Sequence, residues 1–318
     1  MRLLGVFLLP FALAFGQNVI SVQAGLVHYV EGRVLLNGEP LEMTFGKFPQ
    51  MKANGELRTE EGRAEVLMAP GTALRMSENS GFRILSTKLE DIRVEALSGS
   101  LLFEVAEMPK EQALTVIFQD QPTAIRKSGL YRFDSEEGRL RVYDGEARVG
   151  TINVKGSREM ALVGGSEPEK FDASTGDALY RWSKRRSGYL AMANVYAANS
   201  LRNDRWTTSL WGFNRYFGMY TFVPYRGMYN SPFGYYYYSP RAVYNAVYSP
   251  PPVMRAPDPG WSRGAMYNPN LGYSTASRSA APSVAPSASG PVAPSSGASS
   301  ARTADSVSGR GGGGGRGQ

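Results

Sequence analysis

The chain has 318 residues, of which 42% are hydrophobic, and it carries a formal net charge of +7. It contains no cysteine and one histidine, which excludes disulfides, thiol nucleophiles and iron–sulfur clusters and argues against zinc. We therefore expect neither a metal nor a cofactor.

Residues 1–16 have the pattern of a secretory signal peptide. Arg2 is followed by an apolar run from Leu3 to Phe15 and by small residues ahead of Gln17, which is the order of charge, hydrophobic core and cleavage site that such signals share. The run is shorter than a bilayer span and is interrupted by Pro10. We expect export to the periplasm, the cell surface or the medium, and a mature chain that begins at or near Gln17 and has no transmembrane helix.

Residues 25–172 predict an all-β domain of short stacked strands. Strand-like runs of about four to six residues recur roughly every ten residues and are separated by glycine turns. Asn37-Gly38 and Asp144-Gly145 each lie between apolar runs, which is typical of two-residue hairpins. The strand-like runs are residues 64–68, 73–76, 82–85, 101–105, 114–118 and 130–133.

Residues 174–200 predict one amphipathic helix. Ser174 and Asp177 resemble a capping box, and Leu179, Trp182, Tyr189, Ala193 and Tyr196 fall near one face. The basic run Lys184-Arg185-Arg186 is interpreted as a solvated face. Ser187-Gly188 is expected to weaken the middle of the helix.

The remainder predicts a tail in two parts, a tyrosine-rich low-complexity segment (residues 201–273) and a disordered segment rich in Ala, Ser, Pro and Gly (residues 274–318). Folding is therefore expected to stop near Ser200.

Residues 17–182 carry 20 basic and 25 acidic side chains, whereas residues 183–318 carry 14 basic and 3 acidic ones. Such asymmetry favours contact with a polyanion, and the candidate polymer-binding residues are Tyr235, Tyr236, Tyr237, Tyr238, Arg226 and Arg241.

Residues 55–76 read Gly-Glu-Leu-Arg-Thr-Glu-Glu-Gly-Arg-Ala-Glu-Val-Leu-Met-Ala-Pro-Gly-Thr-Ala-Leu-Arg-Met, and this stretch resembles the FecR-type domain. The resemblance continues through residues 94–105 and 124–133 and ends on Val142-Tyr143-Asp144-Gly145-Glu146-Ala147-Arg148-Val149. It implies an extracytoplasmic all-β domain, solenoid-like or sandwich-like, that acts by binding. The anti-sigma and membrane segments of the signalling members are not expected here, so the chain resembles the stand-alone exported form.

Few residues could support catalysis. His28, the single imidazole, lies in a predicted strand, where a structural role is the commoner one. The carboxylate pairs Glu60-Glu61 and Glu136-Glu137 adjoin turn glycines and are interpreted as solvated charge. Arg310 and Arg316 flank a glycine run as in RNA-binding tails, but the expected export makes nucleic acid an unlikely partner. We expect a protein that is not an enzyme.

Two functions remain open. The favoured one is an interaction or structural protein of the cell envelope, whose β domain binds a protein partner and whose basic, tyrosine-rich tail adheres to envelope polymers. The alternative is an extracytoplasmic sensor that binds a signal and relays it to a separate membrane protein.

Overall fold

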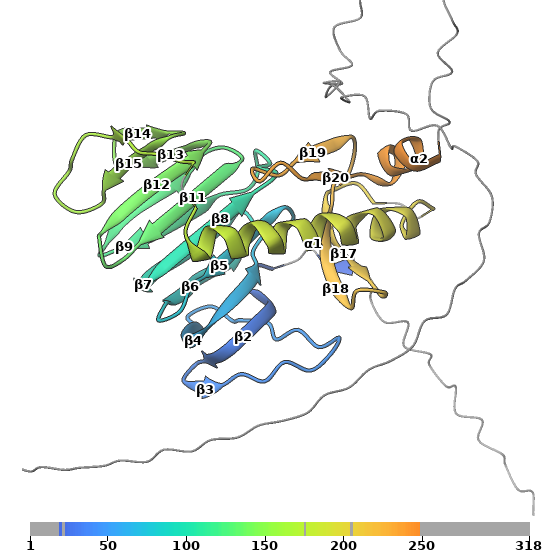
Figure 1. Ribbon diagram of the computed structural model, residues 1–318, viewed down its shortest axis with the longest axis horizontal. Helices are drawn as coiled ribbons and strands as arrows, with labels where there is room; N and C mark the ends of the chain where they lie inside the picture. Colours follow the sequence, from blue (N-terminus) through green and yellow to red (C-terminus); the bar gives the residue numbers. More distant parts are fainter. Residues whose placement is uncertain (1–18, 21–22, 175, 204–205, 249–318) are drawn as a thin grey trace, which may run out of the picture. The chain divides into compact units, whose positions relative to one another are not determined.

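The computed structural model describes residues 19–20, 23–174, 176–203 and 206–248 (Figure 1). The predicted signal peptide, the segment after Tyr248 and the glycine-rich end lie outside the described residues. The elements are β1 (Val19–Ile20), β2 (Leu26–Leu36), β3 (Glu39–Pro40), β4 (Glu56–Leu67), β5 (Thr72–Met76), β6 (Gly81–Lys88), β7 (Asp91–Ser98), β8 (Ser100–Val105), β9 (Leu114–Phe118), β10 (Gln121–Ile125), β11 (Gly129–Asp134), β12 (Arg139–Asp144), β13 (Glu146–Val149), β14 (Ile152–Lys155), β15 (Arg158–Ala161), β16 (Glu169–Lys170), α1 (Ala178–Ser200), β17 (Leu210–Asn214), β18 (Met219–Val223), β19 (Met228–Asn230), β20 (Tyr236–Tyr238) and α2 (Pro240–Tyr248).

Residues 26–170 form one 15-stranded sheet that folds over on itself, so the all-β prediction is confirmed. The main strand order is β14-β13-β10-β9-β7-β6-β4-β5-β8-β11-β12-β15-β16, and β2 joins β4 with β3 on its other edge. Every pair is antiparallel except β7 with β9. The long strand β4 pairs with β6 near its start and with β5 near its end, so it belongs to both halves of the sheet.

The main hydrophobic core lies between the two halves of this sheet, as in a sandwich. Buried side chains come from β6, β7, β9, β13 and β14 on one side, and from β5, β8, β11, β12 and β15 on the other. Alternating burial along β7 and β9 is the pattern of a strand with one face in the core.

The two predicted hairpins have different outcomes. Asn37 and Gly38 have φ values of 54° and 85°, which suits a type I′ turn, and they join β2 to β3 as predicted. Asp144-Gly145 does not close a hairpin, because β12 pairs with β11 and β15 whereas β13 pairs with β10 and β14. The chain instead passes from one half of the sheet to the other at Gly145, whose φ is 93°.

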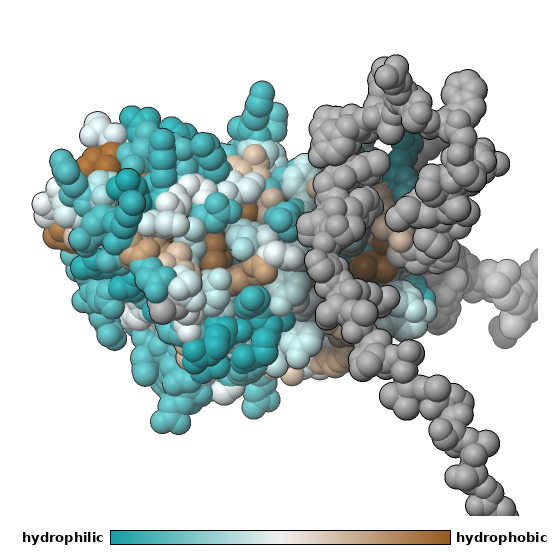
Figure 2. Space-filling view, turned by 45° about the horizontal axis from the view of Figure 1, so that its top comes forward, coloured by the Kyte–Doolittle hydropathy of each residue, from teal (hydrophilic) through white to brown (hydrophobic). Residues whose placement is uncertain are grey.

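Helix α1 lies across the outer face of β5, β8 and β11 (Figure 1). Leu179 and Trp182 pack on Leu102 and Leu130 of the sheet, and Leu190 joins a second apolar cluster with Leu67. Figure 2 shows a surface over the β domain that is mostly hydrophilic, with hydrophobic residues in small separate areas. No helix among residues 19–248, outside the masked positions, is long and apolar enough to cross a membrane.

The prediction that folding stops near Ser200 is wrong. β17 and β18 pair with each other and with β1, and β19 pairs with β20. Trp211, Phe222 and Tyr237 are buried in the same cluster as Leu67 and Leu190. This tyrosine-rich segment folds because its aromatic rings fill space against α1 and the sheet, although its strands are too short and too irregular to show a period of two.

Candidate functional site

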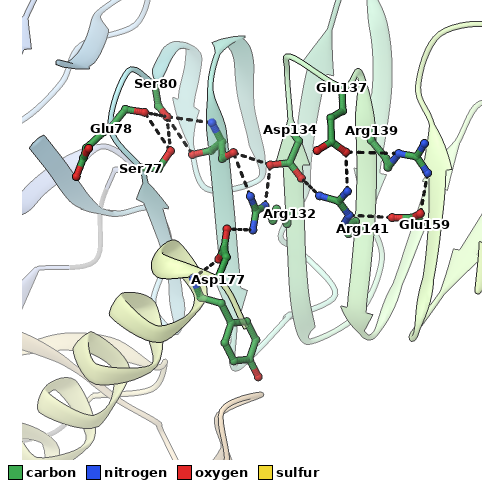
Figure 3. Close-up of polar contacts among 12 residues, drawn as sticks. Ser77, Glu78, Ser80, Arg132, Asp134, Glu137, Arg139, Arg141, Glu159 and Asp177 are labelled. Carbon is green, nitrogen blue, oxygen red and sulfur yellow. Dashed lines mark hydrogen bonds and ion pairs between the residues drawn. The ribbon is translucent and has the colours of Figure 1, made fainter. Parts of the chain in front are cut away.

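The start of α1 is tied to the sheet. The helix begins after Asp177, not at Ser174, and the Asp177 carboxylate accepts a hydrogen bond from the backbone N–H of Tyr180 at 2.9 Å. Arg132 of β11 donates to the same carboxylate at 2.5 Å (Figure 3). An acceptor at the N-cap satisfies one free N–H of the first turn, and the ion pair fixes where on the sheet the helix starts.

Arg132 belongs to a row of ion pairs that crosses β11, β12 and β15 (Figure 3). Asp134 accepts from both Arg132 and Arg141, at 2.7 and 2.5 Å. Arg141 also binds Glu159 at 2.8 Å. Burial would lower the pKa of Arg132, but the Asp134 and Asp177 carboxylates outweigh it and raise that pKa. The row therefore links this face of the sheet to the first turn of α1 through shared carboxylates.

A cluster of buried charges lies beneath the middle of α1. Glu65 and Arg75 are cross-strand neighbours on β4 and β5, and the Arg75 guanidinium bridges Glu65 and Glu104 at 2.7 and 2.6 Å. Arg186 of α1 binds the second oxygen of Glu65 at 2.8 Å and lies 3.9 Å above the ring of Tyr29. The two carboxylates and two guanidiniums balance in charge, as buried ions must.

Mutual attraction keeps Glu65 and Arg75 ionised. Burial alone would raise the pKa of Glu65, but Arg186, Arg75 and the hydrogen bond from His28 hold it well below its usual range. Burial would lower the pKa of Arg75, and Glu104 and Glu65 raise it instead. Arg186 thus contradicts the interpretation of Lys184-Arg185-Arg186 as a solvated face, because Glu65 draws its side chain into the interface.

The same cluster explains why Ser187-Gly188 does not interrupt the helix. The Ser187 hydroxyl donates to Glu104 at 2.6 Å, and the Ser231 hydroxyl donates to the same carboxylate oxygen. Gly188 leaves room for the ring of Tyr235, which lies 3.2 Å from where a Cβ would stand. Both residues are therefore adapted to the interface between α1 and the segment before β20.

His28 is a buried structural histidine, as predicted. Its Nδ1 lies 2.9 Å from Oε1 of Glu65, and its Nε2 accepts from the backbone N–H of Tyr220 at 3.0 Å. Nδ1 must therefore carry the proton and the ring is neutral. Burial lowers the pKa of His28, against the opposing pull of Glu65. A second ring proton would face the Tyr220 N–H and leave both donors without an acceptor.

Stability should therefore fall as the solution is acidified. Below about pH 6.5 His28 binds a proton in the unfolded chain, whereas the buried ring of the folded chain resists protonation. The contribution of His28 to the free energy of unfolding is therefore complete above that pH and decreases as the pH falls below it. Replacing His28 with glutamine should flatten the fall in unfolding free energy between pH 7.5 and 5.5. Urea titrations at a series of pH values measure this. Equal slopes for the two proteins would contradict the assignment, since the chain has no other histidine.

The two carboxylate pairs, which the sequence analysis interprets as solvated turn charge, have separate arginine partners. Glu60 and Glu61 lie within β4, not in a turn, and Glu60 binds Arg33 at 2.9 Å. Glu137 belongs to the charged row and binds Arg141 at 2.5 Å. Within the described parts of the chain, no group of three or more His, Asp and Glu side chains is placed to hold a metal ion.

The six candidate polymer-binding residues divide among three places: a groove, the core and a separate cavity. Tyr235, Tyr236 and Tyr238 line a groove against α1, whereas Tyr237 points away from it and is 2% exposed. Burial beside Glu104 raises the pKa of Tyr237 well above its usual value, so Tyr237 is a core residue. Arg226 and Arg241 line a different cavity, of about 460 Å³, next to Trp206.

The groove has a volume of about 510 Å³ and lies between α1 and the β19–β20 hairpin. Tyr189 and Met192 of α1 form one wall with exposed fractions of 51% and 58%, and Tyr236 on the opposite wall is 47% exposed. Arg185 is exposed at the margin and supplies a positive charge. The sequence pattern does not predict this helix wall, because it groups Tyr189 and Tyr196 on one face with Leu179 and Trp182, which are buried in the structure.

Next to this groove, the exposed side of α1 also carries a pair of aromatic rings. Tyr196 and Tyr216 have ring centroids 4.8 Å apart and are both more than half exposed. Residues 189, 192 and 196 are spaced so that they lie on one face of a helix. This spacing is the sequence signal that could have predicted the exposed stripe. The buried face carries polar residues as well as apolar ones, among them Ser187, Arg186 and Asn194, because it must satisfy the charges and backbone groups beneath it.

Comparison with known proteins gives only a partial likeness. No protein-family model matches the chain, and no curated protein matches it. Two crystal structures of a provisionally assigned anti-sigma factor from Parabacteroides distasonis are similar over 42% of this chain, with TM-scores of 0.32 and 0.33 and identities of 14% and 13%. The match spans 64% and 65% of those chains. At this level the likeness assigns no function.

Proposed function

We infer that this chain is an exported, non-enzymatic binding protein of the cell envelope, and that the groove between α1 and the β19–β20 hairpin binds the sugar rings of an anionic envelope polymer. The observation that carries this proposal is the groove, in which exposed tyrosine rings from two elements face one concave space beside Arg185. In this proposal the β domain of the chain supports the groove and also offers the surface that binds a protein partner.

The chemistry of the walls favours a saccharide. Tyrosine offers a flat apolar face and a hydroxyl that can hydrogen-bond, which suits a surface that is apolar on one side and wet on the other. Arg185 can pair with a phosphate or a carboxylate. The walls are also held in place, because α1 is anchored by the buried ion pair of Arg186 with Glu65, and the Asn194 amide donates to Tyr238 O at 3.0 Å. Little ordering is then needed on binding.

Substituting the exposed tyrosines should weaken retention on isolated envelope material. With each stacking contact on the order of 1 kcal/mol, the double change Tyr189→Ser with Tyr236→Ser should reduce binding by at least about tenfold. Tyr244→Ser is the control, because Tyr244 is similarly exposed but lies in α2, outside the groove. Equal loss in the control, or unchanged binding in the double variant, would overturn the proposal.

Two further arms separate the contributions to this binding. Arg185→Gln should make retention less sensitive to salt, since exposed charge is screened within about 8 to 10 Å at physiological ionic strength. A chain ending at Tyr248 should keep the groove but lack the basic residues after it, so any additional loss of retention measures adhesion by that segment.

N-terminal sequencing of the protein isolated from envelope material should give a sequence that begins at or near Gln17. A chain that still begins at Met1 would argue against export.

A further inference from the structure

The most exposed large apolar side chains of the described chain lie beside the groove rather than in it. Phe45, in the β3–β4 loop, is 83% exposed, and Tyr216, in the β17–β18 turn, is 73% exposed. Phe217 of the same turn and Tyr196 of α1 are also exposed. We call these four residues the aromatic tip, and none of them lines the groove.

Two contacts join the rings of the aromatic tip into one surface. The rings of Tyr196 and Tyr216 have centroids 4.8 Å apart. The ring of Phe45 lies against Gly218, which ends the β17–β18 turn with a φ of 60°. A Cβ at Gly218 would collide with this ring, so the glycine permits the turn and also makes room for Phe45. The β3–β4 loop therefore lies against the β17–β18 turn (Figure 1).

The residues beneath the aromatic tip hold it in place. The side-chain oxygen of Asn214 accepts hydrogen bonds from the backbone N–H groups of the two aromatic residues of the turn, at 2.9 and 3.1 Å. Its amide donates to Ala193 O of α1 at 2.8 Å. In the β3–β4 loop, Phe48 packs on Tyr220 of β18 with ring centroids 5.2 Å apart. Phe45 thus stays exposed although the loop that carries it is anchored.

The charge around the aromatic tip is mainly positive. Arg215 lies in the β17–β18 turn and Lys47 in the β3–β4 loop, and both side chains are exposed. Neither α1 nor the segment 210–223 contains an acidic residue. Glu42 is the single acidic residue of the β3–β4 loop, which has two lysines. An anionic surface is therefore attracted to this side of the molecule.

The shape of the aromatic tip favours a lipid layer over a protein partner. The centre of a protein interface is packed as densely as a protein interior, which requires a partner of complementary shape. Side chains that protrude from two neighbouring turns can enter a fluid layer without such a partner. Aromatic side chains are enriched where a membrane meets water, because tyrosine combines an apolar ring with a polar end. Nearby lysine and arginine are attracted to anionic headgroups.

We propose that the aromatic tip inserts into the interfacial layer of a membrane that contains anionic lipids. The rings of Phe45, Tyr216 and Phe217 enter the boundary between headgroups and acyl chains. Lys47 and Arg215 pair with the lipid phosphates. The chain is then held at a membrane surface with the groove beside the lipid. This binding is independent of the saccharide binding proposed for the groove, because the two sets of residues differ.

The test measures cosedimentation of the protein, purified from its host, with lipid vesicles. Vesicles of phosphatidylcholine and phosphatidylglycerol in equal parts should bind it, and vesicles of phosphatidylcholine alone should bind it more weakly. The double change Phe45→Ser with Phe217→Ser should lower the partition coefficient for the anionic vesicles at least about tenfold, because it removes two apolar rings from the lipid. The thermal melt should be preserved, since both side chains are exposed.

Val163→Ser is the matched control, because Val163 is an exposed apolar residue of the β15–β16 loop. It should leave vesicle binding unchanged. An equal loss in this control, undiminished binding in the double variant, or equal binding to neutral and anionic vesicles would overturn the proposal. A dimer in solution that dissociates in the double variant would also overturn it, since a second copy of the chain would then cover the aromatic tip.

A fluorescence measurement identifies the part of the chain that enters the lipid. Phe45→Trp should add tryptophan emission that vesicles with brominated acyl chains quench, relative to the unchanged chain. Bound protein whose added emission is not quenched would place the contact in another segment and contradict the proposal. Tyr236→Ser should leave vesicle binding intact. Because these vesicles contain no polysaccharide, the membrane proposal and the groove proposal can fail independently.

Discussion

Replacing Arg186 with methionine is expected to lower the free energy of unfolding by about 3–5 kcal/mol. The change removes one guanidinium from the buried cluster and leaves Glu65, which is fully buried, with an uncompensated share of its charge. It also removes the contact with the Tyr29 ring. Urea denaturation followed by tryptophan fluorescence measures the loss, because Trp182 lies one turn away on the same helix and is buried.

Arg185→Met is the matched control for this prediction. Arg185 precedes Arg186 directly but is exposed, so the same substitution should change stability by less than about 0.5 kcal/mol. Adding Glu65→Gln to Arg186→Met should cost less than the sum of the two single changes, because the charge that lacks a partner is then gone. A loss below about 1 kcal/mol for Arg186→Met would show that α1 is not held by this ion pair.

A chain that ends at Ser200 is expected not to fold stably, whereas a chain that ends at Tyr248 should melt like the full protein. The shorter chain lacks Trp211, Phe222 and Tyr237, which cover Leu67 and Ala73 of the sheet. Removing even one buried aromatic side chain typically costs about 3–5 kcal/mol, and a domain has only about 5–15 kcal/mol in total. The shorter chain also loses Ser231 and the Tyr220 N–H, the partners of Glu104 and His28.

Limited proteolysis of the full chain with mass spectrometry checks this expectation directly. The resistant fragment should retain β17 to β20, since Trp211, Phe222 and Tyr237 are buried in one cluster with Leu67 and Leu190. A fragment ending near Ser200 would contradict it. Phe222→Ala in the full chain is the milder variant, and it should be destabilised by about 3–5 kcal/mol without any change in chain length.

Local sequence pattern was sufficient for the all-β class, for most strands and for the turn at Asn37-Gly38. These features depend on neighbouring residues: alternating side chains place one face of a strand in the core, and positive φ at Asn37 and Gly38 is a local preference. The helix over residues 178–200 was also predictable, because its apolar spacing is local, although Ser174 was preferred to Asp177 as its cap.

Only the tertiary structure decided what each element contacts. Asp144-Gly145 has the sequence of a hairpin, yet β12 and β13 take partners in opposite halves of the sheet, because those partners lie far away in sequence. Arg186 is buried because Glu65, 121 residues earlier, supplies its counter-charge. Within one run of four tyrosines, Tyr237 is buried and Tyr236 is exposed. The sequence determines how many aromatic rings this segment has. Packing against α1 determines which of those rings stay exposed and can contact a ligand.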